Sequence, residues 1–151
     1  MPVARASILV PGRAVEAEQL WYDRSRWASW IDDFAAVVRL EDDWPHAGGR
    51  RLWRSRPGGR GLVSERVTRF EIRVGQDLAV EDERLQGTQR VRFEPGHEQT
   101  RITLEYELAP KDRMPPLGRY LLRRRLADSA RRTLTRFSYE LAAERELERG
   151  R

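Results

Sequence analysis

The last third of the chain holds one long helical segment, and the apolar stripe along it constrains the fold more than any other feature. After Pro116, about thirty residues run to Glu146 with no proline and with Gly118 as their one glycine. At ~100° per residue, the apolar side chains fall on one face of this helix. They are Leu122, Leu126, Ala130, Leu134, Phe137 and Leu141. A stripe of this length needs a large apolar partner, and the rest of the chain can supply only a sheet.

The segments before this helix show the period of strands. Residues 4, 6, 8 and 10 are apolar, and Pro11-Gly12 ends this first strand. Two short helices are predicted next, one over Ala14–Tyr22 and one that begins at the cap Asp23 and carries Trp27, Trp30 and Ile31. Later strands are expected at Phe34–Leu40, around Leu52-Trp53, and at Leu62–Ile72, Leu78–Glu83, Gln89–Phe93 and Ile102–Leu108. Their short connections favour an antiparallel meander, so we expect one α+β domain over residues 1–151.

Composition narrows the classes of function. The 29 Lys and Arg residues outnumber the 24 Asp and Glu residues and give a net charge of +5. The chain has no cysteine, which removes disulfides and thiolate chemistry and makes a cytoplasmic location our expectation. His46 and His97 lie beside turn-forming residues, so we expect exposed loops there, no metal and no cofactor. No apolar run approaches the ~18 residues of a membrane span.

Three local motifs resemble one known superfamily. Asp23–Trp30 has the spacing Asp-x-x-x-Trp-x-x-Trp, Glu65–Phe70 follows as a strand motif, and Phe93-Glu94-Pro95 with Thr100–Leu104 forms a last hairpin. These segments resemble the SRPBCC, or START-like (Bet v 1-like), superfamily and its bacterial polyketide cyclase/dehydrase proteins. The resemblance implies a helix-grip fold, in which a curved antiparallel sheet of about six to seven strands wraps around the long C-terminal helix, with two short helices after the first strand. It also implies a cavity for a small, largely apolar molecule.

Aromatic residues are the first candidates for lining such a cavity. Trp27, Trp30, Trp53, Phe70 and Phe93 could form an aromatic wall for a flat ligand, or could simply be core. In the resemblance, Trp30 sits on the helix that closes one end of the cavity. Small residues on faces that should look inward leave volume unfilled, and these are Ala4, Ala6 and Ala36. Binding of a lipid-like or polyketide-like molecule is our leading hypothesis.

A cyclase or dehydratase is the alternative, and it needs an acid or base beside an anion-stabilising group. Tyr106 shares a face with Ile102 and Leu104, and Arg123 lies between Leu122 and Leu126 on the helix. Tyr106 could orient a ligand carbonyl and Arg123 could neutralise a carboxylate or phenolate; both could equally be a core tyrosine and an arginine that covers the sheet edge.

Two carboxylates and a glycine-rich loop complete the candidates. Glu65 and Asp82 point inward or outward depending on a register that is uncertain by one residue. Related cyclases carry a serine and an arginine two apart on the strand that corresponds to Glu65–Val67, whereas positions 65 and 67 of this chain are Glu and Val. The segment Pro57–Gly61 lacks the features of a phosphate-binding loop, so it is predicted to be a hairpin tip.

The arginines of the terminal helix support a third hypothesis, binding of a polyanion. They are Arg119, Arg123, Arg124, Arg125, Arg131, Arg132 and Arg136. Acidic residues follow at once, and Trp and Tyr do not alternate with the arginines on the charged side of the helix to stack bases. We therefore expect only weak, salt-sensitive binding of DNA or RNA and no specific nucleic-acid partner. The oligomeric state is left open.

Overall fold

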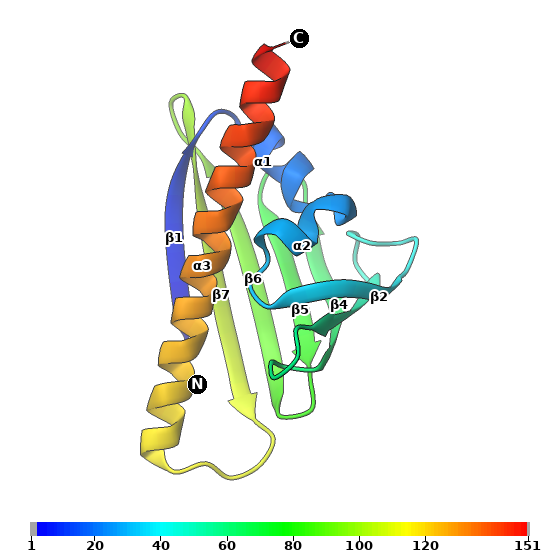
Figure 1. Ribbon diagram of the computed structural model, residues 1–151, viewed down its shortest axis with the longest axis vertical. Helices are drawn as coiled ribbons and strands as arrows, with labels where there is room; N and C mark the ends of the chain where they lie inside the picture. Colours follow the sequence, from blue (N-terminus) through cyan, green and yellow to red (C-terminus); the bar gives the residue numbers. More distant parts are fainter. Residues whose placement is uncertain (1–2, 151) are drawn as a thin grey trace.

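The computed structural model describes residues 3–150, which form one sheet and a long helix packed against it (Figure 1). The helices are α1 (Ala14–Trp21), the 3-10 turn η1 (Arg24–Arg26), α2 (Trp27–Trp30) and α3 (Pro116–Arg149). The strands are β1 (Ala4–Pro11), β2 (Phe34–Leu40), β3 (Arg50–Ser55), β4 (Leu62–Glu71), β5 (Gly75–Glu81), β6 (Leu85–Pro95) and β7 (Gln99–Pro110). The predicted α+β class and element order are confirmed.

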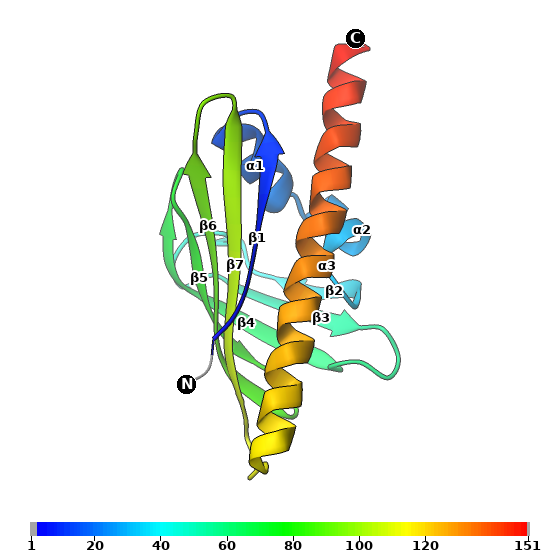
Figure 2. The same ribbon diagram turned by 90° about the vertical axis from the view of Figure 1, so that its left-hand side faces the viewer.

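The sheet is antiparallel throughout, and its order explains how the chain surrounds α3. The seven strands lie in the order β1-β7-β6-β5-β4-β3-β2, so β2 to β7 form a meander and β1 joins beside the last strand. Figure 2 shows the sheet curving, with α3 and the two short helices on its inner side. This arrangement is the predicted helix grip. Within residues 3–150, no helix is both long and apolar enough to cross a membrane.

The core lies where the apolar face of β7 meets the C-terminal half of α3. Alternate residues of β7 from Thr100 to Leu108 are buried, as the period of a half-buried strand requires. The buried residues of α3 are Ala130, Thr133, Leu134, Phe137 and Leu141. Indole rings from α1 and α2 pack on this end of α3: the ring of Phe137 lies 5.1 Å from Trp21 and 5.0 Å from Trp30. These contacts fix the short helices against the long one.

Local hydrogen bonds explain the corner between α1 and α2. The Asp23 carboxylate accepts from the Ser25 backbone N–H at 3.0 Å, which is the predicted cap. The indole Nε1 of Trp27 donates to the Trp21 carbonyl at 2.9 Å. The cap and this bond hold α2 so that Trp30 faces α3.

The small residues that were expected to leave volume unfilled, Ala4, Ala6 and Ala36, lie elsewhere in the structure. In β2, the register shifts between Phe34 and Ala36 and again between Val37 and Arg39. Each bulge moves the following residues to the other face, so Ala36 is exposed rather than inward-facing. Ala4 and Ala6 are buried as expected, but they belong to the core on β1, which packs against α3, and they do not line the cavity between the sheet and that helix.

Candidate functional site

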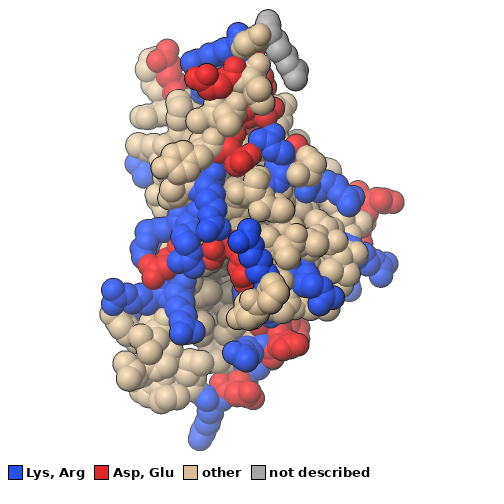
Figure 3. All heavy atoms as spheres, viewed as in Figure 1, with Lys and Arg blue, Asp and Glu red and all other residues tan. Residues whose placement is uncertain are grey.

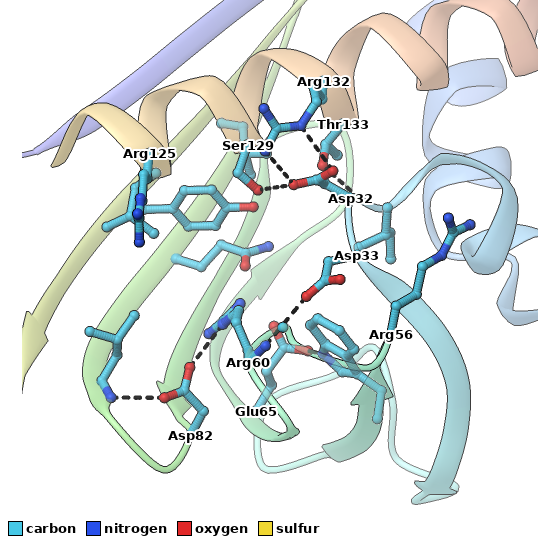
Figure 4. A pocket seen from close by; sticks show the side chains of 18 of the residues that line it. Asp32, Asp33, Arg56, Arg60, Glu65, Asp82, Arg125, Ser129, Arg132 and Thr133 are labelled. Atoms are coloured by element: carbon cyan, nitrogen blue, oxygen red, sulfur yellow. Dashed lines mark hydrogen bonds and ion pairs between the residues drawn. The ribbon is translucent and has the colours of Figure 1, made fainter. Parts of the chain in front are cut away.

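A cavity of about 630 Å³ lies between the sheet and the N-terminal half of α3. Its walls come from β3, β4, β6 and β7, from the loop between α2 and β2, and from the tip of the β3–β4 hairpin. The predicted hairpin tip therefore has a second role, because Gly58, Gly59 and Arg60 close one side of the space (Figure 4). Small-molecule sites in proteins typically enclose about 300–1,000 Å³. The cavity has room for such a ligand.

Part of the cavity wall is apolar and aromatic. Trp21, Trp30, Trp53 and Leu104 contribute to it, and the rings of Trp21 and Trp30 lie 4.5 Å apart. Trp30 is only 1% exposed, and its indole Nε1 has no hydrogen-bond partner within residues 3–150. Rings held in this way offer a large contact area to a flat molecule at low entropic cost.

The floor of the cavity contains a buried ion pair. Glu65, which is 1% exposed, accepts hydrogen bonds at one carboxylate oxygen from Arg51 Nε at 2.7 Å and from Trp53 Nε1 at 2.8 Å. The Arg51 guanidinium also lies over the rings of Trp27 and Trp44, at 4.5 and 4.6 Å. Glu65 thus points inward together with its strand neighbours Val63 and Val67. The pair compensates both buried charges and fixes the Trp53 ring.

Asp82 also points inward, where it holds Arg60. One oxygen of Asp82 accepts from the backbone N–H groups of Arg84 and Leu85, each at 2.8 Å. The other accepts from Arg60 Nε at 2.8 Å. Both oxygens are therefore occupied, and Arg60 has a fixed orientation on the cavity wall with its guanidinium 5.7 Å from the Trp53 ring.

Asp32 fastens the α2–β2 loop to α3. Its carboxylate accepts from Ser129 Oγ at 2.7 Å, from Arg132 Nε and Nη2 at 3.0 Å each, and from Arg136 Nη1 at 3.2 Å (Figure 4). Its backbone N–H donates to Thr133 Oγ1 at 3.0 Å. Burial alone would raise the pKa of Asp32, but the hydrogen bonds from Arg132 and Ser129 outweigh it and hold that pKa below its ordinary value.

Asp33 fastens the same loop to the hairpin tip. Its carboxylate accepts from the Arg60 backbone N–H at 3.3 Å, and its carbonyl accepts from the Arg56 backbone N–H at 2.9 Å. Asp33 itself has φ of 66°, a left-handed conformation that aspartate tolerates better than most residues. A side chain at Gly59 would overlap the Asp33 carboxylate, so a glycine is needed where the two loops meet.

Tyr106 brings a neutral hydroxyl to the cavity. The residue is buried on β7 and lines the cavity, and burial raises its pKa to about 12. Within residues 3–150, its hydroxyl makes no side-chain hydrogen bond that would occupy the proton. A ligand carbonyl or ether oxygen could therefore accept from it.

Positively charged side chains outnumber negatively charged ones around the cavity. Seven arginines and four carboxylates line it. The arginines are Arg51, Arg56, Arg60, Arg84, Arg125, Arg132 and Arg136. Arg51 and Arg60 each pair with a carboxylate, and Arg132 and Arg136 share Asp32. Figure 3 shows Lys and Arg side chains gathered along α3 at the centre of this face, beside acidic ones. The cavity surroundings are therefore positive overall.

The structure brings together only some of the residues that the sequence suggested. Trp30, Trp53 and Tyr106 line the cavity. Phe70 and Phe93 do not, because they pack beneath α1: the ring of Phe70 lies 5.4 Å from Tyr22, and that of Phe93 lies 5.9 Å from Trp21. Trp27 lies behind the wall, against the Arg51 guanidinium. The predicted aromatic wall is thus divided between the cavity and the core.

Arg123 lies outside the cavity. It is exposed, and its guanidinium is 5.9 Å from the Tyr120 ring. The reason is that the inward face shifts along α3, through roughly a quarter of a turn at about 3.6 residues per turn. Arg123 lies on the same side of the helix as Leu134 and Leu141. That side faces the core only in the C-terminal half of the helix. The arginine that faces the cavity in the N-terminal half is Arg125.

Sequence reasoning missed the polar residues on loops and on the edge of the apolar helix stripe. They are Asp32, Asp33, Arg60, Arg125, Ser129 and Arg132. One signal could have found two of them: Asp32-Asp33 is an acidic pair between a helix end and a strand start, a place where chains expose functional loops. His46 and His97 are exposed in loops.

The arginines of α3 are partly neutralised, which bears on the polyanion hypothesis. Arg131 pairs with Asp128, and Arg132 and Arg136 pair with Asp32. The expectation of weak, salt-sensitive nucleic-acid binding stays a prediction.

Solved structures share this architecture at low sequence identity. A conserved protein from Geobacillus kaustophilus is similar with a TM-score of 0.76 and 15% identity, over 94% of this chain and 96% of its own. A START superfamily protein from Mycobacterium smegmatis has a TM-score of 0.75 and 9% identity, over 93% and 97%. The Zhui aromatase/cyclase from Streptomyces sp. R1128 has a TM-score of 0.75 and 13% identity, over 93% of each chain.

No protein-family model matches the sequence, and no curated protein matches it. The structural likeness therefore defines the class by fold. The chain has the helix-grip fold of the START superfamily protein and of the aromatase/cyclase.

Proposed function

We propose that this protein binds a small, largely apolar molecule, lipid-like or polyketide-like, in the cavity between the sheet and α3. The observation that carries the proposal is the cavity of about 630 Å³ with an aromatic wall. The rings of Trp30 and Trp53 supply contact area, and Leu104 and Leu126 extend the apolar lining. Apolar surface buried on binding contributes about 25 cal/mol per Å² before the costs of association.

N-phenyl-1-naphthylamine, a neutral fluorescent probe, tests this proposal, because no charge on the probe contributes to its binding. We expect saturable binding of one probe per chain. Leu126→Trp fills the cavity from α3 and weakens binding at least about tenfold. Leu121→Trp is the matched control, because Leu121 is exposed on the same helix and lies outside the cavity lining. Absence of binding, or equal weakening by both substitutions, contradicts the proposal.

Cyclase or dehydratase activity in the same cavity is the second candidate, and Tyr106 favours it. A neutral phenol beside bound substrate can donate to a carbonyl oxygen and stabilise an enolate as it forms. Since Arg123 is outside the cavity, the anion-holding role proposed for it would pass to Arg60 or Arg125. The Zhui aromatase/cyclase shares the fold, which is an analogy of architecture rather than of residues.

A further inference from the structure

We propose that the molecule held in this cavity carries a carboxylate, and that the carboxylate lies between Arg60 on the hairpin tip and Arg125 on α3. The inference rests on the proposed function, because it identifies the polar end of the ligand whose apolar body contacts the aromatic wall. Three observations carry it: the surplus of arginine around the cavity, the fixed orientation of Arg60, and the absence of an ion pair at Arg125 within residues 3–150.

The surplus is localised rather than spread over the lining. The floor charges cancel in the Arg51–Glu65 pair, and the α3 side contains the Asp32 junction. Arg84, on the turn between β5 and β6, and Arg125, on α3, line the cavity and form no ion pair with any residue from 3 to 150, whereas Arg56 lies on the other side of the cavity in Figure 4. An anionic group would be attracted to the side of the cavity that holds Arg84 and Arg125.

The ion pair with Asp82 orients the Arg60 guanidinium but leaves part of its hydrogen-bonding capacity unused. Asp82 binds only the Nε side, and both oxygens of that carboxylate are already occupied. Arg60 Nη2 is enclosed and has no hydrogen-bond partner among the described residues. A buried donor left unpaired is unfavourable, and an acceptor supplied by a ligand would satisfy it. The guanidinium needs little further ordering to bind it.

Arg125 faces the same space from the opposite wall. Figure 4 shows it reaching from α3 toward the side of the cavity where Arg60 and Asp82 stand. Its exposed side chain can move without breaking an ion pair, so it can close over a bound group. Two guanidinium groups on opposite walls suit a planar carboxylate, because its two oxygens offer about four lone-pair sites for hydrogen bonds.

Asp33 limits how much negative charge the site accepts. Its carboxylate contacts the backbone of Arg60 at 3.3 Å and would repel a second negative charge placed there. A monoanionic carboxylate fits this balance better than a dianionic phosphate ester.

Two probes of the same shape test the inference, 2-naphthoate and its neutral analogue 2-naphthamide. We expect the wild-type protein to bind 2-naphthoate at least about tenfold more tightly than 2-naphthamide at low ionic strength. Arg125→Gln breaks no ion pair within residues 3–150, and we expect it to reduce this preference at least about threefold without changing the affinity for 2-naphthamide. Arg60→Gln should have the same effect. Arg124→Gln is the control, because the neighbouring Arg124 is exposed and lies outside the cavity lining.

The outcomes separate the two proposals. Equal affinity of the wild-type protein for both probes overturns the carboxylate inference and leaves binding of apolar molecules intact. Failure to bind either probe counts against the proposed function itself. A preference that persists in Arg125→Gln and Arg60→Gln overturns the assignment to these arginines. Should circular dichroism show that Arg60→Gln does not fold, because Asp82 has lost its partner, Arg125→Gln decides alone.

Discussion

The two halves of α3 carry one amphipathic pattern but meet different surroundings. In the C-terminal half, Leu134, Phe137 and Leu141 are buried against β1 and the indoles of Trp21 and Trp30. In the N-terminal half, Leu122 and Leu126 are only half-buried and line the cavity. The helix is the same, so the difference comes from the opposite wall. Short helices supply large rings at one end, and charged loops leave open space at the other.

Asp32 marks the border between these halves. The residues that it contacts on α3 all lie within 129–136, where the helix passes from cavity to core. A polar junction at this point lets the α2–β2 loop close the cavity without burying an unpaired charge. The core therefore stabilises the fold, and the junction shapes the site.

The largest effect is expected from truncation in the packed half. Phe137→Ala removes a fully buried ring that contacts two indoles, and should lower the free energy of unfolding by about 3–5 kcal/mol. Leu122→Ala, in the half that lines the cavity, should cost less than about 1 kcal/mol because its side chain already borders empty space. Urea unfolding followed by circular dichroism measures both. Equal losses would mean that the two halves are packed alike.

A smaller, pH-dependent effect is expected at the border. The folded-state pKa of Asp32 is lower than the ordinary 3.8, so its ionised form stabilises the fold fully above that value. This contribution is lost as the pH falls below 3.8 through the folded pKa. Asp32→Asn should therefore unfold about 1 kcal/mol more easily than wild type at neutral pH, since its arginine partners are half-exposed.

Thermal unfolding across the acid range measures this difference. It should shrink toward zero as the pH falls, because the wild-type carboxylate becomes protonated. Asp42→Asn, in an exposed loop, is the control for a general change in charge. A difference that stays constant with pH would show that Asp32 acts through packing rather than through its charge.

The fold was predictable because its signals are local and periodic. The stripe of α3, the alternation in β7 and the Asp23 cap each depend on residues a few positions apart. The bulges of β2 were not predictable, since Ala36 and Val38 continue a regular alternation in the sequence while the strand shifts twice against β3. A bulge is decided by the partner strand, which the local pattern does not contain.

The site was harder to predict than the fold for a similar reason. Trp30 and Trp53 could be named from aromatic content, but the choice between Arg123 and Arg125 depends on how the inward face shifts along α3. That shift follows from a straight helix crossing a twisted sheet, which is a tertiary property. The Asp33–Gly59 contact joins two loops far apart in sequence, and no spacing rule indicates it.

The smallest effect on stability, and the most specific effect on binding, is expected at Tyr106. Its hydroxyl has no side-chain partner within residues 3–150, so Tyr106→Phe should leave the free energy of unfolding within about 0.5 kcal/mol of wild type. If the hydroxyl serves the ligand, a ketone probe, 2-acetylnaphthalene, should bind at least about threefold more weakly to the variant, while 2-ethylnaphthalene, which offers no acceptor, binds equally well to both. Isothermal titration calorimetry with both probes measures the contrast. An unchanged affinity for the ketone would make Tyr106 a wall residue like Trp30, and would remove the observation that favours a cyclase. Loss of stability without any change in binding would instead show that the hydroxyl contributes to packing of the core and not to ligand binding.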